Sequence, residues 1–492
     1  MRFRSAVLWT IVLLAAAHDA GGQEAVPSIS DISSSLGKQD YDAALSRTAI
    51  LLKQKPEDAR LWVARGLALR GLQRTAESLE SFQRALLLRP GNLVALQGAA
   101  EAAYTLDDPS AKKFVGQILA ADPANPVANA MAGSLAYEAG DCKSAMTFFQ
   151  AAPGVLERNT VASLQFSHCL VLNAEAARAV VILEPLKDRD HQDLVAFDLA
   201  SAQYYAGKFD QSAATLEQLQ KQNVDTAQLW NLLGADYDKL DRAPAALEAY
   251  RKACEKAPDT PGYYIDLARF AMEHSSVDAA VRILNAAIDR IPKSAALLTV
   301  RGSVYSVQGD ATKAEADFTL AETVDPGSGY GRVGKSLLLN DQGKSSDAEL
   351  LLRAELKKDP SDKEVEFFLA ETLLRTPTSA NNEEAERLLK DVLKDRPNDS
   401  NVLLALSKTH LAKHENQAAL TLLQHARELD GDSAPILNRL LQTYRALGMK
   451  QQSADVAAQL RNVIDQNRDA ELRRNRFQIT AGSRQDAGSN ND

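Results

Sequence analysis

Apolar and small residues recur along the chain with the period of an α-helix, in pairs of short segments. Residues 227–260 show the pattern clearly. Residues three and four apart share one face of a helix, so each set of positions below predicts one amphipathic helix. The first set is Trp230, Leu233, Gly234 and Tyr237, and the second is Ala246, Tyr250 and Ala253. The pattern therefore predicts a helical hairpin.

Prolines divide this pattern at a nearly constant interval. Successive members lie 33 or 34 residues apart in two series, Pro56, Pro90 and Pro123, then Pro258, Pro292, Pro326 and Pro360. Continued through residues 124–257, the same interval puts repeat ends near Glu157, His191 and Val224 and returns to Pro258. Proline removes a backbone donor and clashes with the preceding turn, so each one ends a second helix. One repeat register runs through the chain.

The residue types at these spacings resemble the tetratricopeptide repeat consensus, and residues 59–92 and 295–328 match it as 227–260 do. The resemblance implies an all-α fold, an α-solenoid in the form of a right-handed superhelix. It contains about thirteen helix-turn-helix units over residues 25–467. The units stack because a lone hairpin cannot bury its apolar face. Small residues such as Gly66, Gly234 and Gly302 mark the expected close crossing of the paired helices. An insertion at 376–379 predicts a longer loop.

The two ends of the chain differ from the array. Arg2 and Arg4 precede a twelve-residue apolar run, 6–17, which is short for a membrane span and typical of a signal peptide. We expect residues 1–22 to be removed, with cleavage after Ala17 or Gly22, although an uncleaved anchor is the alternative. Export to the periplasm or the medium follows, with no transmembrane domain after cleavage. Residues 468–492 predict a short cap helix and a disordered tail.

Charge and cysteine content limit the partners further. The formal net charge of −9 argues against nucleic acid and anionic lipid as partners. Three cysteines are present, and an oxidising compartment would let a disulfide persist. Cys142 and Cys169 fall in neighbouring repeats, so a bridge between them is feasible; the alternative is that both pack as small buried thiols.

The sequence contains no motif that predicts catalysis, a cofactor or a metal. Phosphate-binding glycine loops, nucleophile elbows and paired-cysteine metal motifs do not occur, and the repeats leave no stretch for a catalytic domain. His410 and His414 are four residues apart, but His414 falls at a turn and no acidic third ligand has suitable spacing. We therefore expect a protein that is not an enzyme.

The family resemblance also implies a binding surface, because the first helices of such arrays line a concave groove. Read onto this chain, the groove positions are Phe197, Asp198, Tyr204, Tyr205, Asn231, Asp238, Asp266, Arg269, Phe367, Phe368 and Glu371. Aromatic and hydrogen-bonding groups side by side suit an extended peptide or an amphipathic helix. The alternative for the three phenylalanines is that they pack between helices. The basic set with which some family members grip a terminal carboxylate does not occur.

These features favour a non-catalytic scaffold of the cell envelope that holds extended or helical segments of other proteins, such as envelope or secretion components. A periplasmic component of an exopolysaccharide export, secretion or pilus assembly system is the alternative. The usual outer-membrane barrel or lipid anchor of export arrays is not evident in the sequence. A third class, an enzyme with the array as its targeting arm, would require a catalytic domain that we do not find.

Overall fold

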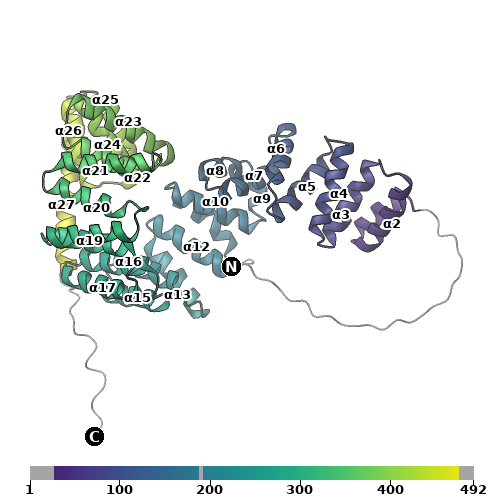
Figure 1. Ribbon diagram of the computed structural model, residues 1–492, viewed down its shortest axis with the longest axis horizontal. Coiled ribbons are helices and arrows are strands. Elements are labelled where there is room, and N and C mark those ends of the chain that lie inside the picture. The colour runs from purple at the N-terminus through teal and green to yellow at the C-terminus, as the bar shows by residue number, and fades with distance from the viewer. Residues whose placement is uncertain (1–26, 188–191, 476–492) are drawn as a thin grey trace, which may run out of the picture. The chain divides into compact units, whose positions relative to one another are not determined.

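The computed structural model describes residues 27–187 and 192–475, and all their regular secondary structure is helical (Figure 1). Contacts divide the chain into two compact units, Met1–Val155 and Leu156–Asp492, with the short α9 (Pro153–Leu156) at the boundary. The described residues form four helical hairpins in the first unit and nine in the second. The predicted all-α solenoid of about thirteen helix-turn-helix units is thus confirmed.

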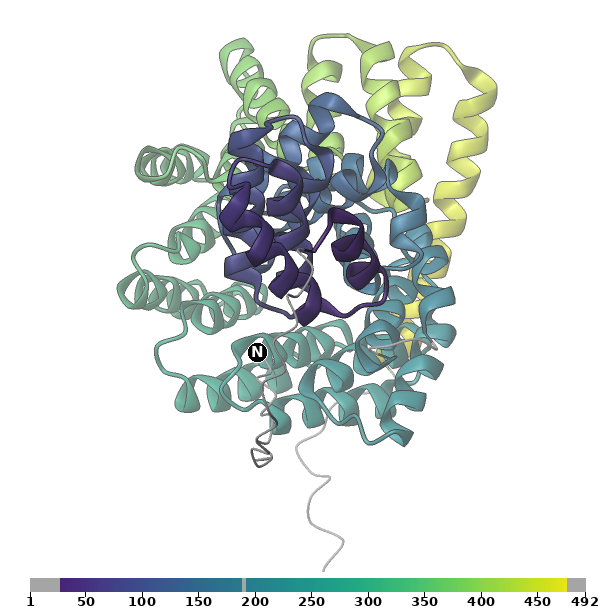
Figure 2. The ribbon, with the colours of Figure 1, turned by 90° about the vertical axis from the view of Figure 1, so that its right-hand side faces the viewer.

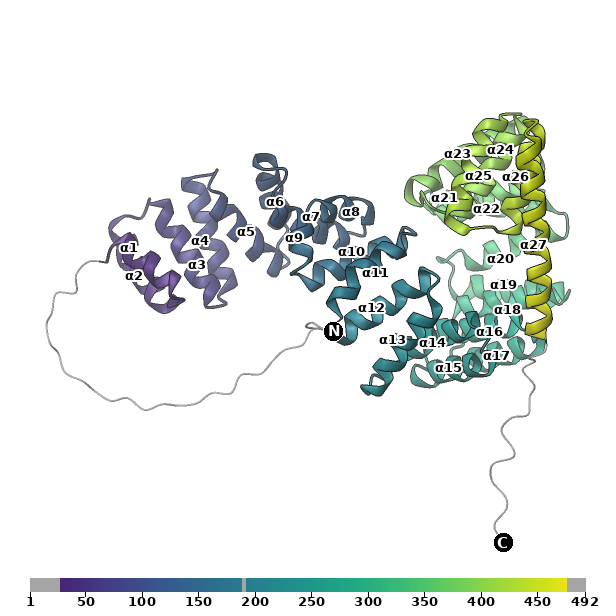
Figure 3. The same cartoon turned by 180° about the vertical axis from the view of Figure 1, so that it is seen from behind.

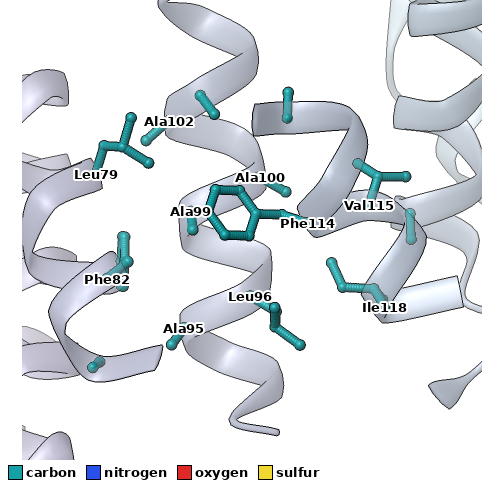
Figure 4. Close-up of a cluster of buried hydrophobic side chains, with 14 of the residues drawn as sticks. Leu79, Phe82, Ala95, Leu96, Ala99, Ala100, Ala102, Phe114, Val115 and Ile118 are labelled. Carbon is teal, nitrogen blue, oxygen red and sulfur yellow. The ribbon is translucent and has the colours of Figure 1, made fainter. Parts of the chain in front are cut away.

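The first unit begins with a short helix of nine residues. Its helices are α1 (Ile29–Gly37), α2 (Tyr41–Gln54), α3 (Ala59–Gly71), α4 (Thr75–Leu88), α5 (Leu93–Thr105), α6 (Ser110–Ala121), α7 (Pro126–Glu138) and α8 (Cys142–Gln150). Phe82, Leu96, Phe114 and Ile118 lie in one buried cluster that joins successive hairpins (Figure 4). The core is therefore a continuous layer between neighbouring repeats, as a one-dimensional array requires.

The second unit repeats the same arrangement. Its helices are α10 (Thr160–Leu172), α11 (Ala176–Leu183), η1 (Glu184–Leu186), α12 (Gln192–Tyr205), α13 (Phe209–Lys221), α14 (Ala227–Lys239), α15 (Ala243–Lys256), α16 (Pro261–Glu273), α17 (Val277–Arg290), α18 (Ala295–Val307), α19 (Ala311–Val324), α20 (Tyr330–Asp341), α21 (Ser345–Lys358), α22 (Lys363–Leu373), α23 (Ser379–Asp395), α24 (Ser400–Ala412), α25 (Asn416–Asp430), α26 (Ala434–Ala446) and α27 (Lys450–Asn475). The insertion gives a loop at 374–378, as expected, and also a 17-residue α23.

Most intra-repeat turns contain one residue in the left-handed backbone region. Glycine supplies it at only some turns, for example Gly309 and Gly343. Elsewhere the residue is Gln39, Gln73, Asp107, Ala174, Asp241, Ser275 or His414. His414, one of the two histidines weighed as metal ligands, is thus a turn residue with φ 59°. The backbone geometry of the turn is conserved along the array although its amino acid is not.

The small residues of the first helices lie against an aromatic ring of the second. A Cβ atom at Gly66 would be 2.6 Å from Phe82, and a Cβ atom at Gly302 would be 2.7 Å from Phe318. Real side chains do not approach so closely, so a larger residue would require the ring or the helix to shift. The close crossing that the sequence predicts is therefore a glycine beneath a buried aromatic ring.

A hydrogen bond to the proline carbonyl recurs where one repeat passes into the next. The donor is the residue six positions after the proline: Trp62 to Pro56 at 2.7 Å, Asn129 to Pro123 at 2.9 Å, Tyr264 to Pro258 at 3.1 Å and Arg332 to Pro326 at 2.7 Å. Carbonyls at a helix end have no partner within the helix. Four different side chains satisfy the same carbonyl position, so the tryptophan of the consensus is replaceable here by other donors.

The second unit also brings distant parts of its own sequence together. Asn398, in the α23–α24 turn, donates from Nδ2 to the carbonyl of Asn173 at 2.8 Å, across 225 residues. Figure 2 shows that the successive helices of this unit follow a curved path. Figure 3 shows that α27 extends from α26 towards α16. Residues 468–475 continue α27 rather than forming a separate cap helix, because no proline or glycine interrupts 450–475.

The signal peptide prediction and the end of the tail lie outside the described residues, and both stay predictions. None of the described helices combines the length and apolarity needed to cross a membrane.

Candidate functional site

Helices α14 and α16 bring three of the predicted binding residues together. Asn231 donates from Nδ2 to Asp266 Oδ2 at 2.8 Å. Arg269, one turn further along α16, donates from Nη2 to Asp266 Oδ1 at 2.7 Å. The Arg269 side chain is nevertheless 63% exposed, whereas that of Asp266 is 25% exposed. The carboxylate of Asp266 is therefore both a link between successive repeats and the partner of an accessible arginine.

Asp238, near the end of α14, makes a second link to α16. Its Oδ1 lies 2.9 Å from Nε2 of His274, and both side chains are nearly buried. The His274 ring packs on Phe270 at a centroid separation of 4.4 Å. Its Nδ1 lies 3.3 Å from the carbonyl oxygen of Arg474, in the last described turn of α27. The C-terminal end of α27 thus contacts the same surface.

Two tyrosines at the end of α12 complete this surface. Tyr204 and Tyr205 lie edge to face at 5.3 Å, and Tyr205 is 64% exposed. Burial raises the pKa of Tyr204, and the charges of Tyr205, Arg269 and Asp238 also act on that pKa. The tyrosine is therefore within electrostatic reach of α14 and α16. We call this surface the first-helix site, composed of Tyr204, Tyr205, Asn231, Asp238, Asp266, Arg269 and His274.

Two further carboxyl groups, on α12 and α14, are largely desolvated. Burial raises the pKa of Asp198 to about 6, against an opposing effect of His168. Burial also raises the pKa of Asp236 to about 7, although a hydrogen bond from Ser212 at 2.6 Å opposes the shift. A buried carboxylate without a cation is costly, and this favours the protonated form. Both groups therefore titrate close to neutral pH rather than in the acidic range usual for aspartate.

The remaining predicted residues lie elsewhere. Phe197 of α12 is partly buried against the apolar cluster of α12 to α14. Phe367 and Phe368 of α22 pack edge to face at 5.5 Å and are partly buried against the core of α22 to α24. Glu371 accepts from Lys408 of α24 at 3.0 Å. No contact given by the described residues joins α22 to the first-helix site, so the predicted set divides into two groups.

His274 and Asp236 belong to this region but were not predicted. His274 is the C-cap residue of α16, just past the positions that the family resemblance assigns to the groove. A usable signal was the spacing of polar residues about one repeat apart. Links between successive repeats join residues 34 to 37 apart, as in Tyr104 with Glu138, Asn231 with Asp266, Asp238 with His274 and Glu371 with Lys408.

The other candidate sites are the cysteines, the candidate metal ligands and a cavity. Cys254 is free and buried, and burial raises its pKa to about 12, so it is a poor nucleophile. Cys142 and Cys169 lie in different units, and their pairing stays a prediction. No group of three metal-ligating side chains occurs among the described residues. A cavity of about 160 Å³ beside α12 is lined by Gln203, Thr215 and neighbours, and contains none of the predicted residues.

Comparison of the sequence with models of known families identifies the family of the chain. Two family models, each described as tetratricopeptide repeat, match the sequence, one over residues 33–92, 197–261 and 265–329 and the other over 378–444. Together they cover just over half of the 492 residues.

The solved structures similar to the chain include the following two. Yeast Tom70 is 17% identical, with a TM-score of 0.41 and coverage of 90% of this chain and 94% of that one. The APC/C hetero-tetramer Cut9–Hcn1 is 16% identical, with a TM-score of 0.39 and coverage of 88% and 86%. The comparison with curated proteins finds no match.

Proposed function

Because the chain belongs to the tetratricopeptide repeat family, we propose that it is a non-catalytic scaffold that binds segments of other proteins, and that it works in the cell envelope. The observation that carries the binding role is the first-helix site. Three successive repeats there present an exposed tyrosine and an exposed arginine over a framework of hydrogen-bonded carboxylates.

The site suits a peptide because one set of its residues holds the repeats in place and a different set is accessible to a partner. Asn231, Asp238 and Asp266 hold neighbouring repeats together and fix the surface before a partner arrives, which lowers the entropic cost of binding. Tyr205 and Arg269 remain accessible. Tyrosine and arginine are the residue types that most often dominate binding energy at interfaces.

The test of the binding role is crosslinking in intact cells, followed by purification of the tagged chain and mass spectrometry. We expect a defined set of proteins that is lost with Tyr205→Ala and Arg269→Ala together. The matched control is Leu350→Ala with Arg282→Ala, because both residues are exposed on second helices, α21 and α17. Equal recovery from the two double variants would refute the assignment of this surface.

The envelope location rests on the N-terminal pattern of Arg2 and Arg4 followed by the apolar run 6–17. Cell fractionation with N-terminal sequencing of the purified chain tests it. A mature terminus after Ala17 or Gly22, in an exported fraction, is the expected result. An intact Met1 in the cytoplasmic fraction would contradict export. The captured proteins would also show whether the scaffold serves polysaccharide export, secretion or pilus assembly.

A further inference from the structure

The C-terminal end of α27 lies on the first-helix site, and the chain continues beyond it. The described contact is that of the Arg474 carbonyl with His274 at 3.3 Å. Most of α27 after residue 460 is exposed, including Ile464 at 50% and Leu472 at 55%. This part of the helix therefore extends away from the core of the last repeat and reaches α16 with little burial of its own on the way.

We propose that the first-helix site is the docking surface of part of the chain's own C-terminal segment, residues 474–482. The inference deepens the proposed function because it concerns the same surface, and it rests on that function for its biological meaning. A partner that binds to Tyr205 and Arg269 would have to displace the segment. The segment is thus an intramolecular competitor built into the chain.

Charge complementarity supports this occupant. Three arginines, Arg473, Arg474 and Arg476, occur within four residues of the sequence, and the carbonyl of Arg474 is the group that contacts the site. The site offers the carboxylates of Asp238 and Asp266, and Arg269 is paired with the second of these at 2.7 Å. An excess of negative charge on a partly desolvated surface attracts a cationic segment more strongly than a fully exposed surface does.

The apolar side chains and the length of the segment also fit. Phe477 and Ile479 alternate with Arg476 and Gln478, which is the pattern of an extended peptide with one apolar side. Neighbouring packed helices are about 10 Å apart, so the path from α16 across α14 to α12 is roughly 20 Å. At about 3.3 Å per residue, six or seven residues span it. Residues 476–482 are therefore sufficient to bring Phe477 and Ile479 over α14 and α12.

The test uses the full chain with Phe477 replaced by the photocrosslinking residue p-benzoylphenylalanine. After irradiation, mass spectrometry locates the crosslinked residues, and gel electrophoresis separates crosslinks within one chain from those between chains. We expect crosslinks within one chain to residues 204–205, 231–238 or 269–274. The matched control places the same residue at Asn490, beyond the expected reach, and should crosslink at background level.

Charge reversal then tests the complementarity. The double variant Arg474→Glu with Arg476→Glu should lower the crosslink yield about ten-fold, because two repulsive pairs replace two attractive ones. These substitutions lie at the end of the chain and leave the repeat cores intact. Asp238→Asn with Asp266→Asn, which removes the charges at nearly constant shape, should lower the yield in the same direction.

Three outcomes would overturn the inference: crosslinks to other surfaces, crosslinks only between two chains, or a yield insensitive to charge reversal. The first two would assign the segment to another site or to a second copy. Failure here is distinguishable from failure of the proposed function. Capture of partner proteins that depends on Tyr205 and Arg269 can persist when the tail does not crosslink, and the tail can crosslink when no partner is captured.

Discussion

The glycine beneath each aromatic ring provides the sharpest test of the packing, and Gly66 is the best position for it. A Cβ atom there would lie 2.6 Å from Cε1 of Phe82, and a Cβ atom at Gly98, in the next repeat, would lie 2.3 Å from Cζ of the same ring. Phe82 is fully buried. The ring is enclosed from two sides, so it cannot move away from a new methyl group at Gly66 without disturbing α5.

The expected magnitude follows from two opposing effects. Alanine in place of glycine within a helix stabilises by about 1 kcal/mol. Overpacking of a well-packed core costs about 1–3 kcal/mol. Gly66→Ala should therefore range from neutral to about 2 kcal/mol destabilising. Gly116→Ala is the matched control, because Gly116 lies exposed inside α6 with no atom within 4 Å of its would-be Cβ, and it should stabilise by about 1 kcal/mol.

Hydrogen exchange followed by mass spectrometry is the suitable assay, because a repeat array need not unfold in one step. Peptides from α3 to α5 should lose protection in Gly66→Ala, whereas peptides from α6 should gain it in Gly116→Ala. Phe82→Leu should partly restore protection in the Gly66→Ala background, since a smaller side chain makes room for the methyl group. Equal stabilisation by both glycine replacements would refute the proposed packing of Gly66 against Phe82.

Three further predictions concern other parts of the chain. Arg332→Leu should destabilise its repeat by about 3–5 kcal/mol, because the buried carboxylate of Glu355 loses the guanidinium that now lies 2.7 Å away. Thermal unfolding measures the loss of stability, and the added substitution Glu355→Leu should restore much of the stability. Asp236 has a folded pKa of about 7, above its usual 3.8, so stability should fall as pH rises from about 4 to about 7. Asp236→Asn should match the wild-type melting temperature near pH 4 and exceed it above pH 7, and a wild type that is the more stable above pH 7 would contradict the shift. Peptide mapping without reductant should recover Cys142 linked to Cys169, and alkylation of both thiols in the unreduced exported chain would rule the bridge out.

The sequence alone determined the repeat architecture, because the physical signals for it are local. Helix period, the spacing of Pro258, Pro292 and Pro326, and glycines such as Gly302 all lie within one 34-residue unit. An array in which each repeat contacts mainly its neighbours needs little information beyond the unit. The register and the thirteen hairpins follow from this. The same local signals predicted that Asn231, Asp238, Asp266 and Arg269 lie on first helices.

Tertiary structure decided which of these residues meet, since the contacts depend on the rotation between successive repeats. The link from Asn231 to Asp266 spans 35 residues, and that from Asp238 to His274 spans 36. In each pair the two residues lie in different repeats, so the periodicity within one helix does not predict the contact. The approach of Arg474 to His274, across 200 residues, depends on the accumulated curvature of the second unit and on the uninterrupted length of α27. Small rotations summed over many repeats have no signature in any one of them, so only the folded chain shows this contact.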